Sequence, residues 1–109
     1  MPRYLLIESR DPFDSNDTRF CCDLATQLAA AKHEVTVFLV QNGVLAVRKN
    51  GRDSYLGRLV GAGITLLADD FSLCERGIQP SELHAGIQQS GMEKLVEMLV
   101  QENAKAIWH

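Results

Sequence analysis

A short stretch, residues 66–78, carries the residue types best suited to chemistry in this chain. An apolar run of strand type leads into two carboxylates, Asp69 and Asp70, and a short amphipathic segment with Cys74 and Arg76 follows. Open α/β sheets place their sites just beyond the carboxyl ends of their strands. We therefore expect a thiol, carboxylates and a guanidinium to gather at such an edge.

Cys74 is the candidate nucleophile of this stretch. It lies near the start of the predicted short helix, two residues before Arg76, and both a helix N-terminus and a cation lower the pKa of a thiol. An accessible thiolate is what persulfide transfer requires, because sulfur moves when a thiolate attacks a sulfur–sulfur bond. The neighbouring acids act in the opposite direction and raise the thiol pKa. A second interpretation stays open, in which Cys74 packs as a small core residue beside Leu73.

The two adjacent acids have a different expected role. Neighbouring residues at a strand end point to different sides, so Asp69 and Asp70 are not expected to share a proton as a catalytic dyad. One of them is expected to cap the helix that follows. Together with Ser9 and Asn42, which also follow predicted strands, Asp69 would line the edge where a small ligand could bind.

Cys21 and Cys22 form a vicinal pair in the first turns of a helix predicted over residues 18–32. The helical period places Cys21 on the apolar face, and places Cys22 and Ala29 near the opposite face. Cys22 is therefore the more reactive candidate of the pair, and the Cys22–Ala29 strip is a candidate contact surface. Because helix cysteines usually pack, we expect neither thiol to be catalytic.

Other common site types find no support. His33, His84 and His109 show no metal-ligand spacing. The loop over residues 9–17 holds no glycine, so it carries neither a dinucleotide fingerprint nor a phosphate-binding loop. We expect no metal and no cofactor.

Composition and charge limit the class of protein further. With 109 residues, a hydrophobic fraction of 46% and a net charge of −3, the chain is expected to form one domain over residues 1–109, and its basic residues do not cluster enough for direct nucleic-acid binding. No apolar run reaches the length of a membrane span. Three cysteines without a CxxC pair predict free thiols in a reducing cytoplasm. A domain this small exposes much of its surface, which favours an oligomer.

Apolar runs alternate with helical patterns along the chain. The expected strands are residues 4–8, 35–40, 64–68 and 104–108, and the expected helices are residues 18–32, 54–60, a short one ending at Gly77, a single turn at 80–83 and one from Met92 onward. This alternation predicts an α/β domain, a mostly parallel sheet of about four to five strands with helices on both faces.

Two local signals need a decision. Asn42-Gly43 between apolar runs is a strong hairpin signal, but the alternation of strands with helices favours a turn into a short helix instead. Residues Ser90 to Glu93 have the form of a capping box that opens the last helix. In that helix we expect Met92, Leu95, Val96 and Leu99 to share the buried face, as we expect of Leu56, Leu59 and Val60 in the helix over residues 54–60.

Three segments in register resemble the DsrE/DsrF/DsrH (Tus-type) sulfur-relay family. They are residues 38–44 (FLVQNGV), residues 72–78 (SLCERGI) and the terminal strand 106–108 (AIW), and they span nearly the whole chain. The resemblance implies a small α/β layer, assembly as homo- or hetero-oligomers with related subunits, and transfer of persulfide sulfur between donor and acceptor proteins. It also implies that Asn42-Gly43 opens a helix.

The chain departs from that family at one position. Counted back from Arg76-Gly77, the sulfur-carrying cysteine of thiol-bearing members falls at Asp69 here, and a carboxylate cannot carry a persulfide. Residues 41–44 and the tryptophan-ended strand resemble the shorter DsrH-like members, several of which lack that cysteine. Three functions stay open: a relay through Cys74 with Arg76 favouring its thiolate, a non-catalytic subunit that acts through assembly, and a small-ligand-binding module.

Overall fold

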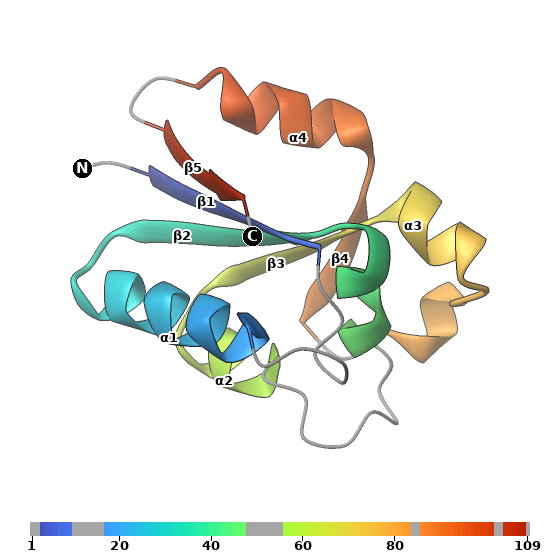
Figure 1. Cartoon of the computed structure of the whole chain (residues 1–109), viewed down its shortest axis with the longest axis horizontal. Coiled ribbons are helices and arrows are strands. Elements are labelled where there is room, and N and C mark those ends of the chain that lie inside the picture. The colour runs from blue at the N-terminus through green and yellow to red at the C-terminus, as the bar shows by residue number, and fades with distance from the viewer. Residues whose placement is uncertain (1–2, 10–16, 48–55, 84–85, 102–103, 109) are drawn as a thin grey trace.

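The computed structural model describes residues 3–9, 17–47, 56–83, 86–101 and 104–108 (Figure 1). Strands alternate with helices along most of the chain. The elements are β1 (Arg3–Glu8), α1 (Asp17–Ala30), β2 (Glu34–Leu39), the 3₁₀ helix η1 (Gln41–Val47), α2 (Leu56–Gly61), β3 (Thr65–Asp69), α3 (Asp70–Glu75), the 3₁₀ turn η2 (Pro80–Glu82), β4 (Ile87–Ser90), α4 (Met92–Leu99) and β5 (Ala104–Trp108).

The five strands form one parallel sheet in the order β4-β3-β2-β1-β5. β1 pairs on one side with β2 and on the other with β5, the last strand of the chain. Because all strands run the same way, their carboxyl ends meet at one edge of the sheet. The α/β class and the predominance of parallel pairing, both predicted from the sequence, are confirmed.

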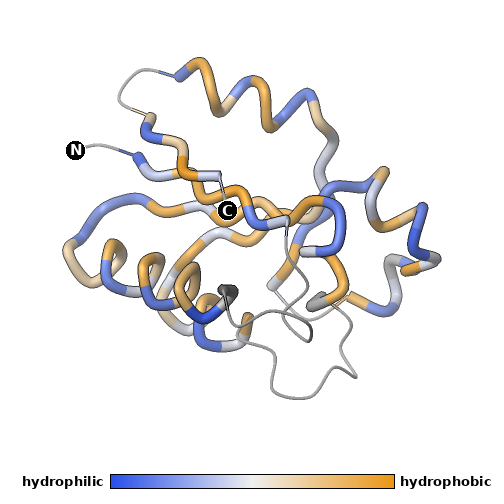
Figure 2. Tube along the Cα trace, viewed as in Figure 1, coloured by the Kyte–Doolittle hydropathy of each residue, from blue (hydrophilic) through white to orange (hydrophobic). Residues whose placement is uncertain are grey.

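Helices cover both faces of the sheet, as predicted. In Figure 1, α1 and α2 lie below the sheet and α4 lies above it. The larger core lies under α1 and α2 and includes Leu6, Val37 and Leu66, whereas the core under α4 is built around Leu5, Phe38 and Leu95. Figure 2 shows hydrophobic residues along the central strands and an alternation of hydrophobic and hydrophilic residues along α1 and α4.

The buried face of α1 differs from the one predicted. Phe20 is 59% exposed, whereas Cys21, Cys22 and Ala25 are buried. Cys22 was expected on the opposite face, but α2 packs against α1 from that side, and Arg58 of α2 reaches Asp23 at 3.7 Å. Burial by both the sheet and α2 widens the apolar face, so the interpretation of Cys22 as a reactive thiol is wrong. The Cys22–Ala29 strip is not a free surface either, since Ala29 also packs against the core.

The segment after β2 forms a helix and not a hairpin. β2 and β3 are parallel neighbours, and η1 follows β2 directly. Gly43 is needed there because a Cβ at this position would overlap the carbonyl oxygen of Glu8. The preference for a turn into a short helix is confirmed, and the glycine allows the chain to pass close to the end of β1.

Several predictions near the C-terminal half are wrong in detail. β4 was not predicted, because Ile-Gln-Gln-Ser is short and mostly polar. The capping box is also wrong: Ser90 ends β4, and Gly91 is the N-cap of α4 without a side-chain hydrogen bond. The single turn expected at residues 80–83 is confirmed as η2.

The inward faces of α4 and α2 are narrower than expected. In α4 only Leu95 is fully buried, with Met98 packed beside it, while Met92, Val96 and Leu99 are exposed. Helical periodicity identifies an apolar stripe but not how much of it the sheet covers. In α2, Leu56 and Leu59 are buried as predicted, whereas Val60 is 38% exposed.

Candidate functional site

A pocket of about 400 Å³ lies at the carboxyl end of the sheet. Its walls come from the residues after β2, from the junction of β3 with α3, from the start of α4 and from the end of β5. The parallel pairing of β1, β2, β3 and β5 brings these chain segments to one edge. The pocket therefore occupies the place where open α/β sheets bind ligands.

Asp69 forms the buried floor of this pocket and is 2% exposed. It caps α3, as one of the two adjacent acids was predicted to do: its Oδ2 accepts hydrogen bonds from the Ser72 backbone N–H at 3.0 Å and from the Ser72 hydroxyl at 2.7 Å. The Ser72 Oγ in turn accepts the backbone N–H of Gln41 at 2.9 Å. These bonds join α3 to η1. The other carboxylate oxygen of Asp69, Oδ1, is buried and has no hydrogen-bond partner among the described residues.

Arg76 and Asn42 form a second link between α3 and η1. The guanidinium donates from Nε at 3.3 Å and from Nη2 at 3.0 Å to Oδ1 of Asn42, and from Nη1 to the backbone carbonyl of Ser72 at 3.2 Å. Asn42, Asp69 and Arg76 all line the pocket. Three of the site residues predicted from the sequence are thus brought together.

Cys74 lies outside this pocket. Its side chain is exposed, so the interpretation of Cys74 as a packed core residue is wrong. It lines a separate hollow of about 240 Å³ with Asp70, Ile78 and Gln89 among its neighbours. The hydrogen bonds described for Arg76 go to Asn42 and Ser72, so a direct effect of Arg76 on the Cys74 thiol stays a prediction.

The vicinal cysteines are buried. Burial raises the pKa of Cys21 far above its ordinary value, and the hydrogen-bonded carboxylate of Glu8 raises it further. Burial also raises the pKa of Cys22, partly offset by the guanidinium of Arg58. Since the thiolate is the nucleophilic form, both thiols are chemically inert in the folded protein.

The remaining candidates lie elsewhere. Ser9 is half-buried and is not among the residues that line the pocket. His33 is half-buried and stacks edge-on against Tyr4, with ring centroids 5.1 Å apart. His84 and His109 lie outside the described residues. Within the described part of the chain, no group of three or more His, Cys, Asp and Glu side chains is placed to hold a metal ion.

Sequence reasoning missed several residues of the pocket. Ser72 was not singled out, although a serine three residues after a capping aspartate is a local signal for hydrogen bonding at a helix start. Phe71, Met92 and Trp108 also line the pocket with largely exposed apolar side chains. Their convergence depends on the pairing of β5 with β1, which no local pattern encodes.

Comparisons with known proteins agree with this architecture. The family model described as the DsrE/DsrF-like family matches residues 3–107. The structure is similar to the crystal structure of the YchN protein from Escherichia coli (TM-score 0.90, 15% identity) and to MTH1491 from Methanobacterium thermoautotrophicum, a protein of unknown function (TM-score 0.83, 19% identity); each match covers 100% of both chains. No curated protein matches. Within the described residues, no helix is long and apolar enough to cross a membrane.

Proposed function

Since the chain belongs to the DsrE/DsrF-like family, we propose that it accepts persulfide sulfur on Cys74 and passes it to a partner protein. The observation that supports this best is the exposure of the three cysteines. Cys74 is exposed, whereas Cys21 and Cys22 are buried with raised pKa values. Cys74 is therefore the thiol that a donor protein can reach.

The transfer is a thiol–disulfide type of exchange. The Cys74 thiolate attacks the outer sulfur of a donor persulfide, a new sulfur–sulfur bond forms, and the bond between the two donor sulfurs breaks. The donor leaves as a thiolate, and Cys74 becomes the persulfide, so no external oxidant or reductant is needed. An acceptor thiolate then removes the outer sulfur in the same way. Because the exchange needs reduced thiols, we propose that it takes place in the cytoplasm.

The direct test is intact-protein mass spectrometry after the reduced protein has been incubated with a persulfide donor. The wild-type protein should gain one sulfur atom. The Cys74→Ser variant should gain none, while Cys22→Ser should behave as wild type because its thiol is buried. If folded wild-type protein gains no sulfur, or if Cys74→Ser still gains it, the relay through Cys74 is wrong.

A second candidate is a non-catalytic subunit that acts through assembly with itself or with related subunits. It is supported by the family position of Asp69, which cannot carry sulfur, and by the exposed apolar side chains of α4 at Met92, Val96 and Leu99. A single helix covers the sheet on this side. Analytical ultracentrifugation of the wild type and of Val96→Glu would test it. A stable oligomer that dissociates in the variant supports assembly through α4, and a monomer at all concentrations excludes self-assembly.

A further inference from the structure

The buried carboxylate at the floor of the pocket has an unused acceptor. Asp69 is 2% exposed; its Oδ2 accepts two hydrogen bonds from Ser72, while its Oδ1 accepts none from the described residues. Buried polar atoms in folded proteins nearly always have a partner, because an unpaired one keeps its full desolvation cost. An N–H donor from a bound molecule would remove that cost.

The charges of the pocket indicate the sign of such a molecule. Two carboxylates, Asp69 and Glu75, line it together with one guanidinium, that of Arg76. The guanidinium is already hydrogen-bonded to the Asn42 side chain on the wall of the pocket. The pocket thus holds one more negative than positive group, which favours a cation over an anion.

The rim of the pocket indicates the shape of the rest of the molecule. Phe71, Met92 and Trp108 line it and are 67%, 49% and 63% exposed. Aromatic faces attract cations and stack on flat rings, and a methionine thioether packs well against them. These three side chains come from α3, α4 and β5, so the apolar surface surrounds the carboxylate from separate elements.

We propose that this pocket binds a small organic cation with N–H donors on a flat apolar body, such as an aromatic amidinium or a protonated amine. Its N–H group donates to Oδ1 of Asp69, and its body packs against Trp108 and Met92. The site goes beyond the sulfur relay, because Cys74 does not line this pocket.

The fluorescence of Trp108, the only tryptophan of the chain, reports on the pocket in a direct titration. The probes are benzamidine, neutral benzamide and anionic benzoate, which share a ring but differ in charge. Benzamidine should change the fluorescence saturably, benzamide should bind about tenfold more weakly or worse, and benzoate should not bind. Equal binding of all three probes, or no binding of benzamidine, overturns the proposal.

Substitution at Asp69 locates the interaction. Asp69→Asn keeps an oxygen that can accept from Ser72 but removes the charge, and should weaken benzamidine binding about tenfold or more. Asp70→Asn is the matched control, because Asp70 is exposed and does not line the pocket. Equal loss in both variants, or no loss in a folded Asp69→Asn, contradicts the assignment.

A measurement on the wild-type protein removes the dependence on a variant that folds. In an ¹H–¹⁵N spectrum, benzamidine should shift the Trp108 indole N–H and the backbone amides of Gln41 and Ser72, which adjoin Asp69. Shifts confined to other regions would overturn the proposal. Cys74→Ser should leave benzamidine binding unchanged, so failure of the relay and failure of this site are distinguishable.

Discussion

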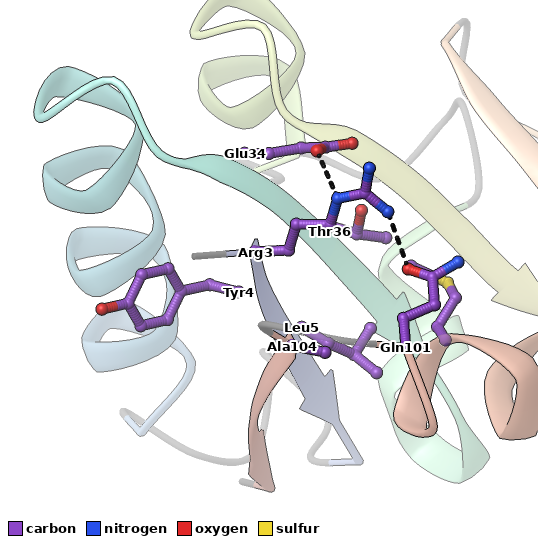
Figure 3. A pocket seen from close by; sticks show the side chains of 8 residues that line it. Arg3, Tyr4, Leu5, Glu34, Thr36, Gln101 and Ala104 are labelled. Carbon is purple, nitrogen blue, oxygen red and sulfur yellow. Dashed lines mark hydrogen bonds and ion pairs between the residues drawn. The ribbon is translucent and has the colours of Figure 1, made fainter. Parts of the chain in front are cut away.

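The two ends of the parallel sheet treat their polar side chains in opposite ways. At the amino end, Arg3 pairs with Glu34 at 3.0 Å and donates to Gln101 at 3.0 Å, around a cavity of only about 30 Å³ (Figure 3). The side chains of the ion pair are 52% and 66% exposed. At the carboxyl end, Glu8 and Asp69 are buried, beside a pocket of about 400 Å³.

This difference separates structural charges from functional ones. Exposed ion pairs contribute little to stability and cost little to form, because water solvates both partners. Buried carboxylates are expensive unless the surrounding structure holds them in place. The carboxyl end therefore spends stability on Asp69 and Glu8, as expected of a site, whereas the amino end needs only to keep its strands aligned.

The largest effect should come from Gly43→Ala, which tests how tightly the carboxyl end is closed. The added Cβ would overlap the Glu8 carbonyl oxygen and lie 3.0 Å from its carbonyl carbon. Because both atoms belong to the backbone of β1, the clash cannot be relieved by a rotamer change. We expect a loss of about 2–4 kcal/mol in the free energy of unfolding, measured by urea denaturation.

Gly57→Ala provides the control for that experiment. Gly57 lies in α2, and a Cβ there would meet no atom within 4 Å. The same substitution should therefore stabilise the protein by up to about 1 kcal/mol, because alanine favours a helix. Similar destabilisation in both variants would mean that the close approach of Gly43 to β1 is unimportant.

Ser72→Ala should have the next largest effect. It removes a hydrogen bond to Asp69 Oδ2 and the acceptor of the Gln41 N–H, leaving a buried carboxylate less well paired. We expect a cost of about 1–3 kcal/mol by urea denaturation. Ser72→Thr, which keeps the hydroxyl, is the comparison variant, and a loss as large as that of alanine would argue for a packing effect instead.

Cys21 should make the stability depend on alkaline pH. Its pKa in the folded protein is raised above the ordinary value of 9.0 by burial and by Glu8, so the unfolded chain loses this proton first. The contribution is fully present below pH 9.0 and is lost as the pH rises above it, by about 1.4 kcal/mol for each pH unit. Urea titrations should show a smaller decrease in Cys21→Ala, and equal slopes would contradict the shift.

The smallest effect should come from the amino end. Arg3→Ala removes the exposed ion pair with Glu34 and the bond to Gln101, and we expect a loss below about 1 kcal/mol in the free energy of unfolding. High salt should reduce the difference between the variant and the wild type. A loss equal to that of Ser72→Ala would erase the distinction between the two ends.

The sequence predicted the strands whose side chains are apolar. The central strands β1, β2 and β3 bury continuous apolar runs, and such runs are readable without a structure. β4 was missed because only Ile87 of its four residues is buried. An edge strand with polar side chains is held by backbone hydrogen bonds to its neighbour, which local side-chain patterns do not report.

The site was predicted in part for a similar reason. The capping role at the start of α3 follows from local rules, and it is confirmed for Asp69. The bond from Arg76 to Asn42 and the bond from Gln41 to Ser72 join residues more than thirty positions apart. Cys22 failed in the same way, because its burial depends on where α2 packs. Contacts of this kind are set by the tertiary fold and not by periodicity.

The pairing of β1 with β5 also has a consequence for how the chain folds. β1 is the first strand to be synthesised and β5 the last, yet the two are bonded neighbours. One hydrogen-bonding edge of an apolar strand therefore has no partner until nearly the whole chain has left the ribosome. Closing that pair requires the ends of the chain to meet, which is entropically costly and slows folding. The interval before β5 arrives is when the nascent protein is most exposed to aggregation.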